Sequence, residues 1–155
     1  MPSSGAPLNL LLAGPDATVR AGASLAPVLQ AGDVVALRGE LGAGKTSFAR
    51  GLIAALGFAG EVPSPSFPIV IPYTPPELRL PLWHVDLYRI EDPGDLEELG
   101  LDDARADSAL LIEWPERMGA ALWPDALCLH IERDGAARRL TWQAPAAWEG
   151  RWPPR

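Results

Sequence analysis

Gly39-Glu40-Leu41-Gly42-Ala43-Gly44-Lys45-Thr46 matches the phosphate-binding pattern G-x-x-x-x-G-K-S/T in full. Such a loop wraps a phosphate chain with backbone N–H groups, and its glycines let the backbone come close. Lys45, the only lysine of the chain, can place its charge on the β- and γ-phosphates, and the Thr46 hydroxyl can ligate Mg²⁺. An apolar run at 34–37 predicts a strand before the loop, and residues 47–56 predict a helix after it. We therefore expect nucleotide contacts from Glu40, Leu41, Gly42, Ala43, Gly44, Lys45, Thr46 and Ser47.

The composition indicates one compact domain. A chain of 155 residues with 48% apolar content can bury one core, so we expect a single domain at 1–145. The Pro- and Trp-containing residues 146–155 are expected to form a loose tail or a docking segment. The sequence has no apolar stretch of 18 residues and no signal-type N-terminus, which favours a cytoplasmic location away from membranes. The net charge of −7 and the lack of a basic run argue against a large direct nucleic-acid interface.

Apolar periodicity and turn residues divide the rest of the chain. Strands are predicted at 8–12, 82–88 and 109–112, and an Asp134-Gly135 turn predicts a hairpin of strands 127–132 and 138–142. Four prolines between Glu61 and Tyr73 favour an extended, irregular segment. The fold class we expect is α/β: a three-layer P-loop NTPase domain. Its sheet should be mostly parallel and flanked by helices, with an antiparallel hairpin at its C-terminal edge.

Phosphate transfer or hydrolysis also needs a carboxylate near the metal, at the carboxyl end of a neighbouring parallel strand. Two residues fit this requirement. Glu113 follows the apolar run 110–112, and Asp86 lies on the polar face of the strand at 82–88. Either acid could ligate the metal or orient the attacking water, and each could instead be a solvated carboxylate at a strand end.

Other polar residues carry weaker signals. Ser64 and Ser66 could bring a hydroxyl to the γ-phosphate or to Mg²⁺ as a switch segment does, although Ser-Pro is also common in turns. His84 on a strand face is more often a structural hydrogen-bonding residue than a catalytic base. Cys128 lies between two leucines, which is typical of a small buried hydrophobic residue without reactivity.

Several motifs together resemble the TsaE family, also called YjeE. They are the phosphate-binding loop and the segments Ser64-Pro65-Ser66-Phe67, His84-Val85-Asp86-Leu87-Tyr88-Arg89 and Ile112-Glu113-Trp114-Pro115-Glu116. The resemblance runs from about Gly32 to Ile131 in the family's order and spacing. Ser66 stands where the family usually has Thr, which keeps the hydroxyl, and Trp123-Pro124 replaces the more usual Leu-Pro.

The resemblance implies an ATPase component of the bacterial machinery that makes N6-threonylcarbamoyladenosine in tRNA. A TsaE protein is expected to bind the TsaB–TsaD complex and to hydrolyse ATP with Mg²⁺, so its contact with tRNA would be indirect. Carried over to this chain, the resemblance makes Lys45 and Thr46 the residues that bind phosphate and Mg²⁺ and makes Asp86 and Glu113 the acids needed for ATPase activity, without settling which acid activates water. Because Glu113 also has the position of a Walker-B-type acid, we expect Lys45, Asp86 and Glu113 to be catalytic and Thr46 and Glu113 to ligate the metal. It also places Trp114 beside the nucleotide.

Three other functions would each require sequence features that can be looked for in this chain. A GTPase would usually carry N-K-x-D, yet the only asparagine is Asn9 and the only lysine lies in the loop. A small-molecule P-loop kinase would need a lid rich in Arg or Lys, and no loop here gathers several basic residues. A nucleotide-dependent binding module, in which ATP orders the segment 61–73 for docking, stays open.

Overall fold

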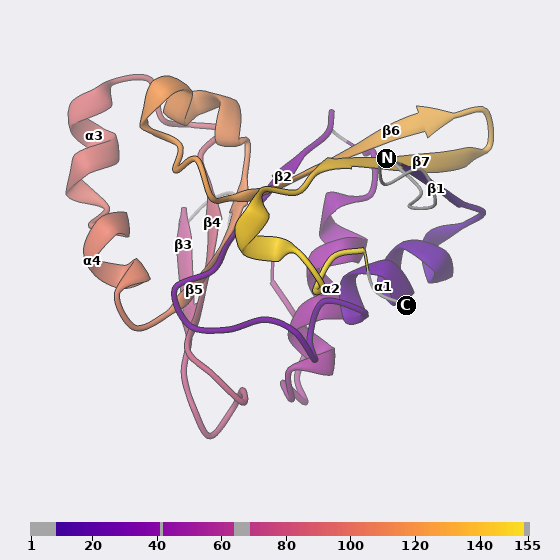
Figure 1. Cartoon of the computed structure of the whole chain (residues 1–155), viewed down its shortest axis with the longest axis horizontal. Coiled ribbons are helices and arrows are strands. Elements are labelled where there is room, and N and C mark those ends of the chain that lie inside the picture. Colours follow the sequence, from indigo (N-terminus) through magenta and orange to yellow (C-terminus); the bar gives the residue numbers. More distant parts are fainter. Residues whose placement is uncertain (1–8, 41, 64–68, 154–155) are drawn as a thin grey trace.

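The computed structural model of the chain describes residues 9–40, 42–63 and 69–153, which form one seven-stranded sheet with helices around it (Figure 1). Across the sheet the strands follow the order β1-β7-β6-β2-β5-β4-β3. The strands are β1 (Asn9–Leu12), β2 (Val34–Arg38), β3 (Val70–Tyr73), β4 (Leu82–Asp86), β5 (Ala109–Glu113), β6 (Leu127–Asp134) and β7 (Ala137–Gln143). The helices are α1 (Pro15–Ala23), α2 (Lys45–Ala55), α3 (Pro93–Glu98) and α4 (Leu101–Arg105), with 3-10 helices η1 (Pro115–Ala121) and η2 (Ala146–Trp148).

Parallel pairing is confined to the centre of the sheet. There β2 pairs with β5 on one side and with β6 on the other, and β4 pairs with β5. Both flanks are antiparallel, with β3 on β4 and the β6–β7 hairpin extended by β1. The predicted α/β P-loop fold is confirmed, but the hairpin does not form the edge, because the first strand of the chain lies outside it.

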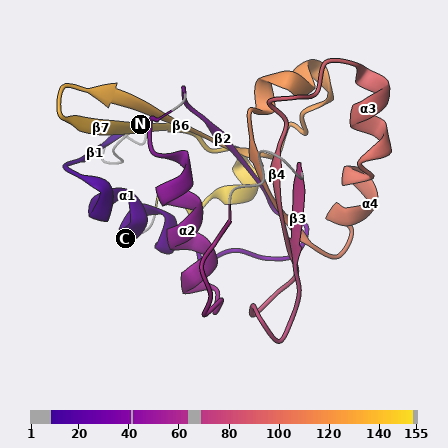
Figure 2. The same cartoon turned by 180° about the vertical axis from the view of Figure 1, so that it is seen from behind.

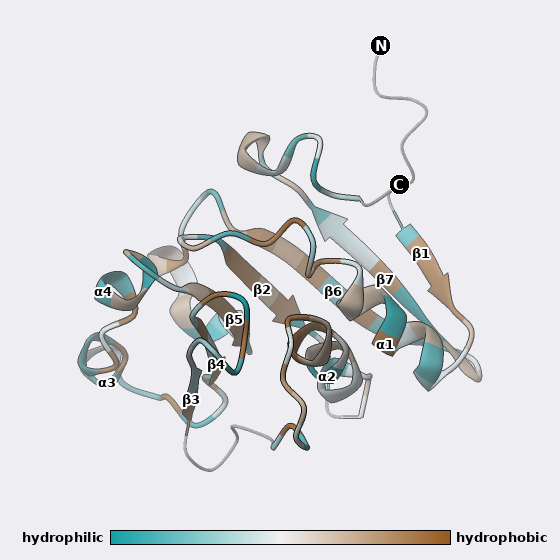
Figure 3. Ribbon diagram, turned by 90° about the horizontal axis from the view of Figure 1, so that it is seen from below, coloured by the Kyte–Doolittle hydropathy of each residue, from teal (hydrophilic) through white to brown (hydrophobic). Residues whose placement is uncertain are grey.

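Two hydrophobic cores lie on opposite faces of the sheet, which makes three layers. Along β2, Val35 and Leu37 pack into the core beneath α1 and α2, whereas Val34 packs into the core covered by α4 and η1. This alternation is what a strand buried on both faces requires. Figure 3 shows β2 as a hydrophobic strand in the middle of the molecule.

Helices α1 and α2 touch through two glycines, and they lie side by side in Figure 2. A Cβ added at Gly22 would lie 2.0 Å from the Phe48 carbonyl oxygen, and one at Gly51 would lie 2.0 Å from the Val19 carbonyl oxygen. No side chain fits at either contact. This close packing fixes the position of α2, and therefore of the phosphate-binding loop that precedes it.

The segment after Pro145 is not a loose tail over residues 146–153. Trp148 is 1% exposed and belongs to the core beneath α1 and α2, and the Trp152 ring packs edge-on against Trp142 at 5.5 Å. Arg151 forms an ion pair with Asp33 at 2.7 Å. The expectation of a tail was wrong for these residues, because their tryptophans complete the core instead of facing solvent.

Two expectations from composition can be set beside the structure. The thiol of Cys128 is half-buried and free, and burial raises its pKa, which fits the expected lack of reactivity. Within the described ranges, no helix has the length and apolarity needed to span a membrane.

Candidate functional site

The phosphate-binding loop joins β2 to α2, as the sequence predicts. Gly42 and Gly44 have φ angles of 80° and 120°, a conformation that favours glycine. Position 39 requires glycine because of close packing, since a Cβ there would lie 2.8 Å from the Ile131 carbonyl oxygen. The N-terminus of α2 has no side-chain cap, so its first N–H groups are available to an anion. Leu41 lies outside the described residues.

Lys45 is buried at the base of this loop. Its ammonium group donates a hydrogen bond to the Gly39 carbonyl oxygen and lies 4.1 Å from the centroid of the Trp114 ring. Burial lowers the pKa of Lys45, while the negative charges of Glu113, Asp86 and Glu116 act in the opposite direction. The only lysine of the chain thus lies within the field of both predicted acids.

Asp86 and Glu113 are partners across β4 and β5, directly opposite each other in parallel register. Each is the last residue of its strand, and each is less than a tenth exposed. Since Glu113 also lies opposite Leu37 of β2, two residues before Gly39, both acids lie at the edge of the sheet where the loop begins. The structure therefore brings together the two acids that the sequence predicts.

The two carboxylates differ in their surroundings. Burial raises the pKa of Asp86, while the backbone N–H of Tyr88, which donates to Oδ1 at 2.9 Å, favours the carboxylate form. One oxygen of Glu113 lies 2.7 Å from Nε2 of His84, which is 2% exposed. His84 is thus the structural hydrogen-bonding residue that the sequence suggested, and its partner is the predicted metal ligand.

Trp114 directly follows Glu113 and has φ 59° and ψ 49°, a left-handed conformation that is rare for a large residue. This turn places its ring over Lys45 and 4.9 Å from the Tyr88 ring. Trp114 therefore lies beside Lys45 of the loop, and its contact with a nucleotide stays a prediction.

Two arginines of the β6–β7 hairpin contact the loop, and sequence reasoning missed both. Arg138 donates hydrogen bonds to the carbonyl oxygens of Ala43 at 3.0 Å and of Gly42 at 3.3 Å. Arg133 forms an ion pair with Glu40 at 3.5 Å. The adjacent arginines 138 and 139, in an otherwise acidic chain, were the only sequence signal.

A cavity of about 300 Å³ opens between this hairpin, the loop and the start of α1. Gly14 and Thr18 line it from the α1 side, Gly44 and Ser47 from the loop side, and Arg138 from the hairpin. The predicted contact residue Ser47 therefore faces a space next to the phosphate-binding backbone. Ser64 and Ser66, the switch candidates, lie outside the described residues.

The oxygen donors at this edge of the sheet fit Mg²⁺, which prefers carboxylate, hydroxyl and phosphate oxygens. Thr46 is exposed at the first turn of α2, beside Lys45, and Asp86 and Glu113 end the neighbouring strands. In the part of the chain that the structure describes, no three His, Cys, Asp or Glu side chains gather to hold a metal alone. Mg²⁺ is usually held by one or two carboxylates together with substrate phosphates, so these residues suit it.

Comparisons with known proteins agree with this architecture. The family described as threonylcarbamoyl adenosine biosynthesis protein TsaE matches residues 12–141. The tRNA threonylcarbamoyladenosine biosynthesis protein TsaE of Streptomyces coelicolor is 47% identical over 115 residues, which cover 72% of this chain and 76% of that protein. The protein of the same name from Mycobacterium leprae is 37% identical over 135 residues, covering 81% and 84%.

A solved structure is also similar. The crystal structure of Bacillus subtilis YdiB superposes with a TM-score of 0.77 and 30% sequence identity, and the match covers 92% of this chain and 88% of YdiB. Sequence and structure thus lead to the same family. The chain belongs to the TsaE family of threonylcarbamoyl adenosine biosynthesis proteins.

Proposed function

We propose that this protein hydrolyses ATP with Mg²⁺ and acts on the TsaB–TsaD complex in the biosynthesis of tRNA threonylcarbamoyladenosine. The observation that carries the proposal is the pairing of Asp86 with Glu113 at the loop edge of the sheet, within the field of Lys45. A protein that only binds nucleotide needs a phosphate loop and at most one acid that orders the metal. A second buried acid opposite the first supplies a group that can position the attacking water, which hydrolysis needs in addition to the metal.

The two acids take different roles in this proposal. Glu113 and the Thr46 hydroxyl hold Mg²⁺, and His84 fixes the Glu113 carboxylate from the other side. When bound, Mg²⁺ neutralises charge on the β- and γ-phosphates. Asp86, which ends β4 directly opposite Glu113, accepts a proton from the attacking water, and burial, which raises its pKa, makes the carboxylate a stronger base.

The remaining groups bind and position the phosphates. The loop N–H groups and the N-terminus of α2 take up phosphate charge, and Lys45 leaves the Gly39 carbonyl to meet the β- and γ-phosphates. Trp114 then covers the site from the η1 side. Such a shift of Lys45 exchanges a neutral acceptor for a charged one, which strengthens its hydrogen bond.

The test is ATP hydrolysis measured with and without the cognate TsaB–TsaD complex, using Lys45→Ala to detect contaminating activity. We expect slow hydrolysis by the protein alone, stimulation by the complex, and no activity in Lys45→Ala. A rate that the complex leaves unchanged would contradict the proposed partner.

Asp86→Ala and Glu113→Ala separate hydrolysis from a pure binding module. The proposal requires both variants to bind ATP and neither to hydrolyse it or support tRNA modification. If one of them kept full modification activity, the binding-module alternative would be the better account.

A further inference from the structure

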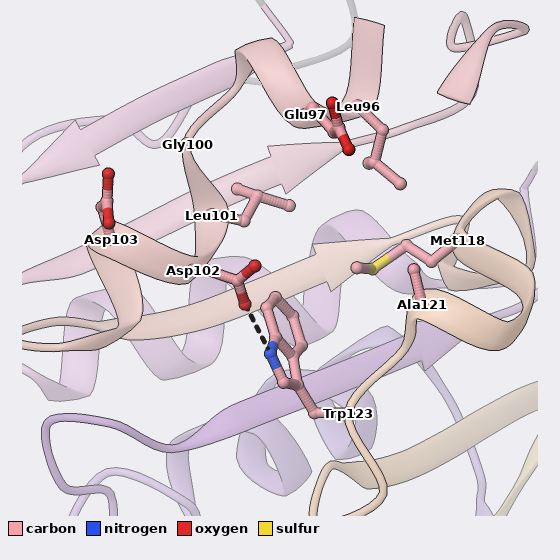
Figure 4. A pocket seen from close by; sticks show the side chains of 9 residues that line it. All are labelled: Leu96, Glu97, Gly100, Leu101, Asp102, Asp103, Met118, Ala121 and Trp123. Carbon is pink, nitrogen blue, oxygen red and sulfur yellow. Dashed lines mark hydrogen bonds between the residues drawn. The ribbon is translucent and has the colours of Figure 1, made fainter. Parts of the chain in front are cut away.

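A groove of about 430 Å³ lies between α3–α4 and η1, away from the phosphate-binding loop. Its floor is apolar, with Leu101 and Met118 buried and Trp123 half-buried. Its rim carries the acidic side chains of Glu97 and Asp102, as Figure 4 shows. The groove therefore combines an apolar interior with a negatively charged margin.

The negative charge of this region is concentrated and not neutralised locally. Residues 91–107 contain eight acidic side chains and one basic side chain, Arg105. Arg105 already donates to the Gly32 carbonyl oxygen at 2.7 Å and pairs with Asp125. Among the described residues, Glu97, Asp102 and Asp103 form no salt bridge. The acidic side chains of the rim can therefore form ion pairs with basic groups of another molecule.

The aromatic wall of the groove is held in place before any partner arrives. The indole N–H of Trp123 donates to Asp102 at 2.8 Å, and the Arg105 guanidinium lies 5.3 Å from its ring centroid. A side chain that is already ordered loses little entropy on binding. Tryptophan and methionine are also residue types that are enriched at protein interfaces.

The elements that form the two walls of the groove follow, along the chain, the two strands that end in Asp86 and Glu113. From Asp86 the chain runs through residues 87–92 into α3, and from Glu113 it runs through Trp114 into η1. A partner seated between α3–α4 and η1 would hold these two segments together. Occupation of the groove can therefore affect the positions of the acids without contact with the nucleotide.

We propose that this groove is the docking surface for a basic segment of a partner protein. One large apolar side chain of that segment enters between Leu101, Met118 and Trp123, and flanking Lys or Arg side chains meet the acidic rim. Charge complementarity selects this occupant, since the acidic rim repels the phosphates of RNA. The inference rests on the proposed function, in which the TsaB–TsaD complex is the partner.

The test compares adjacent residues of α3 that carry the same charge. Glu97 lines the groove, whereas Glu98 is exposed on the same helix and does not line it. The affinity for the purified TsaB–TsaD complex, with ATP present, is measured for wild type, Glu97→Lys and Glu98→Lys at about 50 and 300 mM NaCl. We expect Glu97→Lys to weaken binding about tenfold or more at low salt, and Glu98→Lys to weaken it less than about threefold.

A second pair tests the apolar interior without a change of charge. Ala121→Trp fills the groove, whereas Ala120→Trp adds the same side chain to a neighbouring exposed position outside it. We expect only Ala121→Trp to reduce binding of the complex. An unchanged affinity for ATP in all four variants shows that they are folded.

The outcomes separate this inference from the function on which it rests. If wild type binds the complex and both Glu97→Lys and Ala121→Trp bind it equally well, the groove is not the docking surface, although the proposed function stands. If these variants instead dissociate a homodimer or release tRNA, the occupant is a second copy or RNA and the inference is wrong. If wild type does not bind the complex at all, the proposed partner fails and the inference fails with it.

Discussion

Nε2 of His84 lies 2.7 Å from a carboxylate oxygen of Glu113, and both side chains are buried. His84 lies on β4 two residues before Asp86, the residue opposite Glu113. Its contact with Glu113 therefore joins β4 to β5, and His84 is well placed to fix the orientation of this acid. The other ring nitrogen, Nδ1, is buried and has no hydrogen-bond partner among the described residues. Among the described residues, the His84 ring therefore has one hydrogen-bond partner, the proposed metal ligand Glu113.

The first prediction concerns this contact. His84→Phe should leave the Glu113 carboxylate without its partner and lower kcat or Mg²⁺ affinity by about 10- to 100-fold, the usual effect of losing a group that orients a metal ligand. His84→Gln, which keeps an N–H donor at a similar distance, should restore most of the loss. The measurements are kcat, KM for ATP and the Mg²⁺ dependence of ATP binding. Equal behaviour of the two variants would mean that the ring fills space and does not orient Glu113.

The second prediction concerns pH and Asp86. Burial raises the folded-state pKa of this carboxyl above its ordinary value of 3.8, so the folded protein holds the proton more tightly than the unfolded chain does. Stability contributed by the protonated form is therefore lost as pH rises from about 4 through the folded-state pKa. Asp86→Asn keeps an acceptor for the Tyr88 N–H and carries no charge.

Asp86→Asn should consequently be more stable than wild type at pH 7, and the difference should shrink as the pH approaches 4. Urea unfolding of both proteins between pH 4 and 7.5 measures this. A difference that stays constant over that range would show that the ionisation of Asp86 does not oppose folding.

The third prediction separates two neighbouring arginines. Arg138 donates to the carbonyl oxygens of Ala43 and Gly42, whereas Arg139 pairs with Asp134 and donates to Asn9, away from the loop. Arg138→Ala should weaken binding of ADP and ATP about tenfold, since two hydrogen bonds that shape the loop are lost. Arg139→Ala should change the affinity less than about twofold. Similar losses in both variants would indicate a general effect of charge instead of a contact with the loop.

The contacts of Arg138 and His84 could not be predicted from the sequence, whereas other parts of the site could. The strand, loop and helix around Lys45 follow from a local pattern, and so do the acids at the ends of two apolar strands. Arg138 lies on β7 and reaches the loop because β7 pairs with β6 and β6 pairs with β2. The second pairing joins segments far apart in the chain, which no local pattern specifies. The partner of His84 could not be identified for the same reason, because it depends on the register of β4 against β5.

The last segment shows a different limit. Prolines and tryptophans near a chain end are equally compatible with a loose tail and with a packed cap, because composition does not reveal whether a core has room for them. Trp148 belongs to the core beneath α1 and α2, and that core forms only when segments far apart in the chain come together.

The fourth prediction concerns the contact between α1 and α2. Gly51→Ala would place a Cβ 2.0 Å from the Val19 carbonyl oxygen, so the two helices must separate. We expect a loss of at least about 3 kcal/mol in the free energy of unfolding, at the upper end for overpacked sites. Gly14→Ala is the control, because its Cβ would meet nothing within 4 Å and its φ of −167° suits any residue. Equal stability of the two variants would contradict the close contact.

The fifth prediction tests whether residues 146–153 stabilise the domain. Trp148→Ala should cost about 3–5 kcal/mol, the range for a large side chain removed from a core, and lower Tm by about 10 °C for a chain of this size. Glu149→Ala, at the exposed neighbouring position, should change stability by less than about 0.5 kcal/mol. Thermal unfolding of both variants, and of a chain ending at Pro145, gives the comparison. A truncated chain with the Tm of wild type would show that the segment lies on the domain without stabilising it.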